Sequence, residues 1–239
     1  PGHITAGSST TFSSGSAVKA AAETVRNRLR ERAAALLGAT DAVLGGARLT
    51  VPGDPGRSMG LDEALARIGE DLSARAVLTV GSTDHIVNSF AAHFAEVEVE
   101  METGRIRILR YVAAHDSGRI VNPRLAASQV SGGVLQFLGI ALREELYLDP
   151  ASGVTLNPSF LEHKSTAIVD FPAIETIFAG EPDPAAPYGA KALGEPPVVP
   201  VLGAVVNAVA NATGVWLHET PFTPQRVLEA IRPQARRTP

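Results

Sequence analysis

The sequence of 239 residues predicts an α+β fold in which helices pack on a mixed or antiparallel sheet. Three observations favour this class: several amphipathic helical segments, one strong hairpin, and several short strands between them. With 45% hydrophobic residues, 22 glycines and 17 prolines, the chain can bury a sizeable core. We expect one globular unit, or two with the ranges 1–90 and 91–239. The pattern of elements does not determine the order of the strands.

The composition excludes several functional classes. The formal net charge is −4 and no basic stripe is visible, which argues against nucleic acid as a partner. We find no uninterrupted apolar run of membrane-spanning length and no signal-peptide pattern, so we expect a cytoplasmic protein without a membrane partner. The chain has no cysteine, which excludes thiolate metal sites and iron–sulfur ligation by its own residues.

The N-terminal segment, residues 1–13, is rich in small polar residues and precedes a helix. The helix is predicted after Ser16 and should stop at Gly38. Its apolar residues recur at helical spacing, at Val18, Ala22, Val25, Leu29, Ala33 and Leu36. The polar segment is either a flexible loop or a cradle of backbone amides and hydroxyls for an anion.

The next elements are short. A strand at 48–51 lies within a loop region that spans 39–60. Leucines and an isoleucine at helical spacing then indicate an amphipathic helix over 61–72, followed by a short apolar strand over 76–80 and a loop.

A hairpin is predicted over 94–113, with its turn at Glu102–Arg105. Three glutamates on the first strand could suggest a cation site, but the arginines opposite them make cross-strand charge pairing the better explanation. These residues are Glu96, Glu98 and Glu100, and Arg105, Arg107 and Arg110. The scattered histidines His93, His115 and His163 are interpreted as structural or pocket residues rather than metal ligands.

A long helix should begin at Pro123, with Asn122 as its cap, and continue to Asp149. One of its faces carries Gln129, Gly132, Gly133 and Gln136. Each glycine costs about 1 kcal/mol in a helix relative to alanine, so the pair needs a reason. Close approach of a ligand and tight packing against another element are equally good explanations from the residues alone.

Glu195 lies between a glycine and two prolines, after a loop-rich region over 147–186. Gly194 would let a ligand approach the backbone, and Pro196 should push Glu195 towards extended dihedral angles. A helix is predicted over 198–212. Glu195 is then either a general base aimed by a stiff corner or an acidic residue that complements a helix dipole. A strand around Trp216 and a last helix, capped by Thr223, should follow.

The stretch YGAKALGEPPVVPVLGAVVNAV closely resembles the C-terminal signature of the molybdenum-binding subunit in the xanthine dehydrogenase / aldehyde oxidase family, the molybdenum hydroxylases. The hairpin segment AHFAEVEVEMETGRIRILRYVAAHD and the Gln-x-x-Gly-Gly pattern are similar to the same family. The resemblance covers nearly all of 1–239. It implies that this chain is the C-terminal part of the cofactor-binding region, with the molybdopterin-binding fold of the xanthine dehydrogenase type.

The resemblance also implies a set of site residues. The family's glutamate before two prolines is the active-site base, which points to Glu195. A Ser/Thr-rich segment and the helix glutamine hold the pterin, and molybdenum is held through the pterin without a protein ligand. Carried over, the cofactor contacts are Gly7, Ser8, Thr10, Gln129, Gly132, Gly133 and Gly194. Ser131 stands where the family commonly has an acidic residue, which marks a divergent branch.

The implied activity is oxidative hydroxylation of an aldehyde or N-heteroaromatic substrate, with Glu195 accepting a proton. The implied cofactor is molybdopterin with molybdenum, as the cytosine dinucleotide. Iron–sulfur clusters and FAD are expected on partner subunits. The first half of the family's subunit is missing, so this chain is either a naturally split subunit or a truncated fragment that another chain or domain completes. The alternative function is a non-catalytic assembly, cofactor-insertion or binding domain that keeps the fold.

Overall fold

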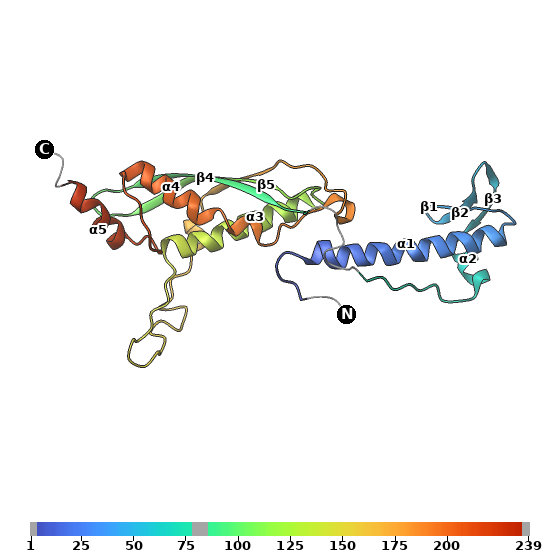
Figure 1. Ribbon diagram of the computed structural model, residues 1–239, viewed down its shortest axis with the longest axis horizontal. Helices are drawn as coiled ribbons and strands as arrows, with labels where there is room; N and C mark the ends of the chain where they lie inside the picture. Colours follow the sequence, from blue (N-terminus) through green and yellow to red (C-terminus); the bar gives the residue numbers. More distant parts are fainter. Residues whose placement is uncertain (1–3, 78–85, 236–239) are drawn as a thin grey trace. The chain divides into compact units, whose positions relative to one another are not determined.

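The structure is a computed structural model that describes residues 4–77 and 86–235, and these form two compact units (Figure 1). The first unit contains α1 (Thr10–Leu36), β1 (Val43–Gly45), β2 (Arg48–Val51), β3 (Asp54–Gly60) and α2 (Leu61–Ile68). The second unit contains Thr5–Ser9, β4 (Phe90–Val99), β5 (Ile106–Asp116), α3 (Pro123–Leu142), β6 (Ala173–Phe178), α4 (Val201–Thr213) and α5 (Pro224–Ala235).

The first unit packs α1 and α2 on a small antiparallel sheet of order β1-β2-β3. Its core consists of small and aliphatic side chains, including Leu29, Ala33, Leu49, Met59 and Ala64. The strand predicted at 48–51 is confirmed as β2. The surrounding loop prediction is wrong, because β1 and β3 pair with the two edges of β2. Most of β3 is exposed, so its sequence lacks the apolar alternation that reveals a half-buried strand.

Helix α1 begins at Thr10, earlier than the sequence predicts. Serine, threonine and glycine cost at most about 1 kcal/mol each in a helix, so an established helix can extend through such a segment. Helix α2 confirms the amphipathic segment but ends at Ile68. The strand predicted over 76–80 is not formed at 76–77, and its remainder lies outside the described residues.

The second unit is built on a three-stranded sheet of order β4-β5-β6. The predicted hairpin is confirmed as the antiparallel pair β4–β5, which extends further than expected to Phe90 and Asp116. Strand β6 pairs in parallel with β5, from Ala173 against Arg110 to Phe178 against His115. The region 147–186 therefore contains a strand that the sequence did not predict. The sheet is mixed, which agrees with the predicted α+β class.

Charge pairing across the hairpin is confirmed for one pair and corrected for another. Arg107 pairs with Glu98 at 2.6 Å. Arg110 stands opposite Glu96 in the β4–β5 register, but its guanidinium pairs with Glu175 on β6. The sequence could not assign this partner without the parallel strand. Within residues 4–77 and 86–235, no three histidines, cysteines or carboxylates gather in a way that could hold a metal ion.

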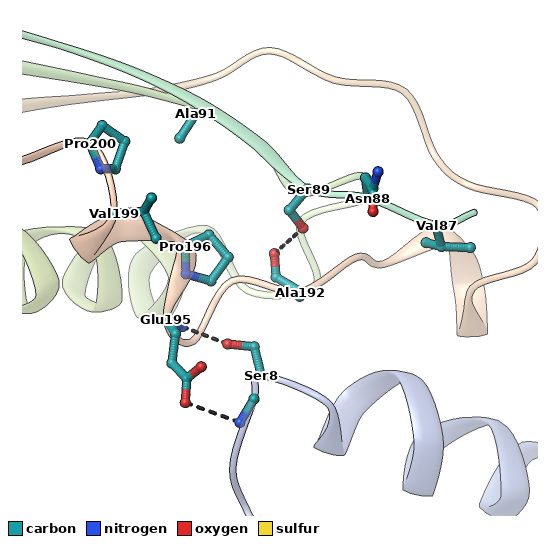
Figure 2. A pocket seen from close by; sticks show the side chains of 11 residues that line it. Ser8, Val87, Asn88, Ser89, Ala91, Ala192, Glu195, Pro196, Val199 and Pro200 are labelled. Atoms are coloured by element: carbon teal, nitrogen blue, oxygen red, sulfur yellow. Dashed lines mark hydrogen bonds between the residues drawn. The ribbon is translucent and has the colours of Figure 1, made fainter. Parts of the chain in front are cut away.

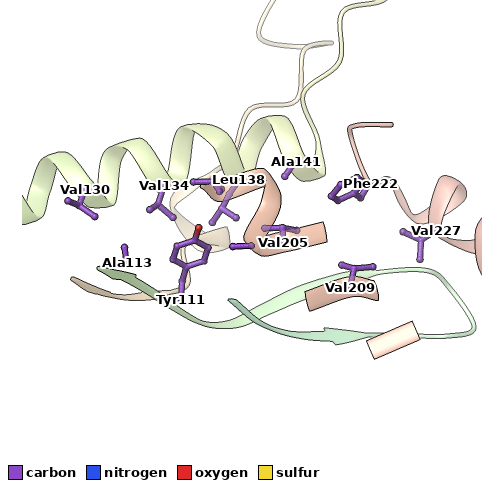
Figure 3. Packing of buried hydrophobic residues seen from close by; sticks show 12 residues of the cluster. Tyr111, Ala113, Val130, Val134, Leu138, Ala141, Val205, Val209, Phe222 and Val227 are labelled. Atoms are coloured by element: carbon purple, nitrogen blue, oxygen red, sulfur yellow. The ribbon is translucent and has the colours of Figure 1, made fainter. Parts of the chain in front are cut away.

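Helices α3 and α4 pack their apolar faces against one face of the sheet (Figure 3). The core between them contains Tyr111, Ala113, Val130, Val134, Leu138, Ala141, Val201, Val205, Val209, Phe222 and Val227. By length and composition alone, α3 and the segment Pro196–Thr213 could each cross a membrane. Both contribute valines to this core, as expected of the central helices of a folded domain.

The structure differs from the sequence prediction at the end of α3 and around Trp216. Helix α3 stops at Leu142 rather than Asp149, because the Ala141 carbonyl, which a continuing helix would give to Glu145, accepts instead from the amide of Phe222 at 2.6 Å. The strand predicted around Trp216 is absent, and that side chain is 59% exposed. The two predicted caps are confirmed, because Asn122 accepts from the Leu125 amide and Thr223 accepts from the Arg226 amide.

Candidate functional site

Glu195 stands immediately before a 3₁₀ turn at Pro196–Val198 that leads into α4. Its dihedral angles, φ −102° and ψ −27°, lie in the right-handed helical region, so the predicted extended conformation is wrong. A following proline disfavours this region, but the turn bond from the Val198 amide to the Glu195 carbonyl, at 3.0 Å, requires it. The corner is therefore tighter than the sequence predicts, and it leaves the Glu195 side chain exposed.

The N-terminal peptide of the second unit forms two hydrogen bonds with Glu195 (Figure 2). The Gly7 amide donates to Glu195 Oε1 at 3.0 Å, and the Glu195 amide donates to Ser8 Oγ at 2.6 Å. Gly7 and Ser8 have φ angles of +60° and +54°, in the left-handed region that a serine rarely adopts. Both the backbone and the carboxylate of Glu195 are thus held by the same dipeptide.

Gly194 and Gln129 complete this arrangement. Gln129, on α3, donates from Nε2 to the Gly194 carbonyl at 2.7 Å. A Cβ atom on Gly194 would lie 3.0 Å from Ser8 Oγ, so a larger residue would push Ser8 away. No residue in the described part of the chain donates to Gln129 Oε1. The structure therefore brings together five of the predicted site residues: Gly7, Ser8, Gln129, Gly194 and Glu195.

The two helix glycines have different surroundings. A Cβ atom on Gly133 would lie 2.9 Å from Pro197 Cβ, so Gly133 allows α3 to pack closely under the turn that carries Glu195. A Cβ atom on Gly132 would meet nothing within 4 Å. Tight packing explains Gly133, but no packing contact explains Gly132.

We therefore expect opposite effects from two neighbouring substitutions. Gly133→Ala should destabilise the second unit by about 1–3 kcal/mol, because the added methyl group must displace Pro197. Gly132→Ala should stabilise it by up to about 1 kcal/mol through helix propensity. Urea unfolding of the two variants beside the parent chain measures both effects. Equal destabilisation by both substitutions would contradict the packing explanation.

A pocket of about 430 Å³ opens beside Glu195 (Figure 2). It is lined by Gly7, Ser8, Val87, Asn88, Ser89, Ala91, Ala192, Glu195, Pro196, Val199 and Pro200. Ser89 fixes one wall, because its hydroxyl donates to the Ala192 carbonyl at 2.6 Å. No sequence pattern identifies Val87, Asn88 and Ser89, because the polar segment before β4 that carries them has no motif of its own.

Thr10 lies in the first turn of α1 and belongs to the first unit. Its Oγ1 atom is buried and has no hydrogen-bond partner among the described residues. Thr10 therefore belongs to a different unit from the other predicted site residues, which all lie in the second unit.

Two histidines, His93 and His115, are buried in the second unit. His93 Nδ1 lies 3.0 Å from the Tyr111 hydroxyl, and His93 Nε2 lies 2.9 Å from His115 Nε2. Burial, followed by the charge of His115, lowers the pKa of His93 to about 4, and burial lowers the pKa of His115 as well. Both rings are therefore neutral near pH 7, and they link β4 to β5 within the core.

Comparison with known proteins identifies the family. A family model for the molybdopterin cofactor-binding domain matches residues 1–172. The putative xanthine dehydrogenase molybdenum-binding subunit XdhA of Escherichia coli K12 is 42% identical over 141 residues, which is 59% of this chain and 19% of that protein. The aldehyde oxidoreductase molybdenum-binding subunit PaoC of Escherichia coli K12 is 37% identical over 178 residues, 73% of this chain and 24% of that protein.

The fold is also similar to a solved structure, the Cu,Mo-CO dehydrogenase in its carbon monoxide reduced state. That match has a TM-score of 0.81 and 25% identity, and it covers 96% of this chain and 30% of the other. This chain thus spans less than a third of each of these three proteins. The family match ends at residue 172, before the Glu195 segment, whereas the structural match extends over nearly the whole chain. The chain therefore belongs to the molybdopterin cofactor-binding domain family, whose members here are molybdenum-binding parts of xanthine dehydrogenase and aldehyde oxidoreductase type enzymes.

Proposed function

We propose that this chain forms part of a molybdenum-cofactor-dependent oxidoreductase that hydroxylates an N-heteroaromatic or aldehyde substrate, with Glu195 as the general base. The observation that carries the proposal is the position of Glu195 at the pocket, with its amide and one carboxylate oxygen held by Ser8 and Gly7. Family membership supports the reaction class. The names of the relatives, a xanthine dehydrogenase and an aldehyde oxidoreductase, support the two substrate classes.

The residues around Glu195 suit a pterin. A pterin presents neutral hydrogen-bonding edges, and Gln129 Oε1 is an acceptor that no described residue uses. Gly7 and Gly132 have open space where a Cβ atom would stand, so a flat ligand could approach the backbone there. We propose that these residues hold the cofactor together with Ser8, Thr10, Gly133 and Gly194. We further propose that the cofactor is the cytosine dinucleotide form of molybdopterin, which supplies the two-electron oxidation when bound.

Glu195 would act through its second carboxylate oxygen. Gly7 donates to Oε1, whereas no residue in the described ranges donates to Oε2. The first oxygen therefore fixes the orientation of the carboxylate, and the second is left to accept a proton from the attacking oxygen nucleophile. Holding a base in this way lowers the barrier because little rotational freedom remains to be lost during the proton transfer.

The chain spans less than a third of the length of its relatives. We propose that another chain or domain supplies the rest of the molybdenum-binding subunit, and that iron–sulfur and FAD subunits carry the electrons away. The substrate is a small molecule, and the proposed location is cytoplasmic.

The proposal is tested by purifying the chain from its host with its associated proteins, and separately alone. We expect about one molybdenum per chain in the complex, measured by elemental mass spectrometry, and none in the chain alone. The complex should oxidise at least one member of a panel of aromatic aldehydes and hydroxypurines with an artificial electron acceptor. A complex with stoichiometric molybdenum but no oxidation of any panel member would favour the non-catalytic alternative. A complex without molybdenum would refute the cofactor assignment.

A further inference from the structure

Lys191 and Asp116 form the ion pair with the least exposed cation among the described residues. Lys191 Nζ lies 2.7 Å from Asp116 Oδ2, and the two side chains are 11% and 23% exposed. This partly buried pair stands between exposed ion pairs, which contribute little to stability, and buried pairs, which are costly to break because an uncompensated charge remains. Breaking this pair should therefore cost more stability than breaking one of the exposed pairs on the strands and helices.

Besides Lys191, the Asp116 carboxylate contacts the backbone at Gly118 and at Gly180. Its Oδ1 atom accepts from the Gly118 amide at 3.1 Å, and a Cβ atom on Gly180 would collide with the same oxygen. Burial raises the pKa of Asp116, but the hydrogen bonds from Lys191 and the Gly118 amide, with the charge of Lys191, outweigh it and leave the pKa below its usual value. Asp116 is thus an ionised and spatially fixed anchor at the end of β5.

Backbone contacts hold the Lys191 segment against the same anchor. The Lys191 amide donates to the Ser117 carbonyl at 2.9 Å, and the Arg119 amide donates to the Gly189 carbonyl at 2.8 Å. Gly118 has a φ angle of +63°, and a Cβ atom there would collide with the Gly189 carbonyl oxygen. The chain after β5 therefore lies directly against residues 189–191.

Residues 191–195 then run from this anchor to the candidate base. Along the way, the Ala192 carbonyl accepts from Ser89 and the Gly194 carbonyl accepts from Gln129. Lys191 is the only residue of this five-residue stretch whose side chain forms an ion pair in the described structure. The stretch is fixed at one end by Lys191 and at the other by Ser8 and Gly7 at Glu195.

We propose that the Asp116–Lys191 pair is a positioning clamp that holds residues 189–195 so that the Glu195 carboxylate stays at the pocket. Its catalytic consequence rests on the proposed function of Glu195, whereas its structural consequence does not. Lys191 and Asp116 act through the backbone that carries Glu195 and are positioning residues. A displacement of about 1 Å at a reacting group can lower a rate about 100-fold, so a moderate loosening of this stretch should be visible in turnover.

The experiment compares Lys191→Met, Asp116→Asn and the double variant in the purified complex. Amide hydrogen exchange of the peptide 187–199 is expected to be at least tenfold faster in each variant, with little change in α4. We expect kcat to fall about tenfold to a hundredfold, with molybdenum content unchanged and KM within about threefold. Because the two groups act as one pair, the double variant should be no worse than the more impaired single variant.

Arg226→Met is the matched control, because it removes another ion pair of the second unit, Arg226–Glu145 at 2.6 Å. It should lower thermal stability without changing exchange in 187–199 or kcat. Asp116→Asn keeps the shape of the side chain, so it remains informative should Lys191→Met fail to fold. Unchanged exchange of 187–199 in the variants would overturn the clamp. Faster exchange with unchanged kcat would leave the clamp standing and refute the role of Glu195.

Discussion

Replacing Glu195 by glutamine should lower kcat of the assembled complex by about 10²–10⁴-fold, the range typical of losing a general base. The amide oxygen of glutamine can still accept from the Gly7 amide, and the Glu195 backbone bond to Ser8 is independent of the side chain. The variant therefore keeps the contacts that the structure shows but loses the ability to accept a proton. Steady-state kinetics with the best panel substrate, normalised to molybdenum content, measures the loss.

The matched control for this experiment is Glu219→Gln, which neutralises an exposed glutamate of the second unit outside the pocket. It should leave kcat and molybdenum content at parent values. Should the Glu195 variant turn over at the parent rate with full molybdenum, the assignment of the base would be wrong. Should it lose molybdenum in proportion to activity, Glu195 would be a cofactor-holding residue instead.

Mild acid should destabilise the second unit strongly, because His93 and His115 are buried as neutral rings. Their exposed fractions are 9% and 1%. A histidine in the unfolded chain has a pKa of about 6.5, whereas folded His93 has a pKa of about 4. As the pH falls from 6.5 to 4, the unfolded chain therefore binds a proton at this position and the folded chain does not, so the free energy of unfolding decreases. The stabilisation is complete above pH 6.5. Relative to pH 7, His93 alone should remove roughly 2 kcal/mol at pH 5 and roughly 3 kcal/mol at pH 4.

Urea unfolding at pH 7 and pH 5, followed by the fluorescence of Trp216, measures this effect, since Trp216 is the single tryptophan and lies in the second unit. The carboxylates with lowered pKa values, such as Asp116, take up protons mainly below this window. His218→Gln, at an exposed histidine, should keep the full pH dependence, whereas His93→Gln should remove the part that His93 contributes. A parent chain that loses less than about 0.5 kcal/mol between the two pH values would contradict the buried neutral pair.

Local sequence patterns correctly predicted the elements that depend on residues close together in the sequence, namely the hairpin and the two helix caps. The alternation over β4 and β5 is period two with a turn containing Gly104, and both strands form. Asn122 and Thr223 form the caps that their positions before a proline predict. The sequence motifs also grouped Gly194 with Glu195, and the resemblance added Gly7, Ser8 and Gln129, which the structure places in contact with them.

Long-range partners could not be predicted in the same way. Strand β6 pairs in parallel with β5, although more than fifty residues separate the two strands in the sequence. Nothing in the six residues of β6 indicates which strand they pair with. The early end of α3 depends on Phe222, which is distant in the sequence and whose amide donates a hydrogen bond to the Ala141 carbonyl. The backbone of Glu195 departs from the preference of a residue before proline because a 3₁₀ turn needs its carbonyl. Asp116 and Lys191 each lie in a quoted motif, but their pairing appears only in three dimensions.

The hydrogen bond between Gly7 and Glu195 joins residues that are 188 positions apart. During synthesis the N-terminal peptide leaves the ribosome long before its partner exists, and β4, β5 and α3 are all complete by the time residue 195 emerges. Each doubling of loop length adds about 0.6 kcal/mol to the entropic cost of closure, so this contact is among the most expensive in the chain to form. During synthesis the contacts around Glu195 can therefore form only after the residues of the sheet and of α3 have all been made.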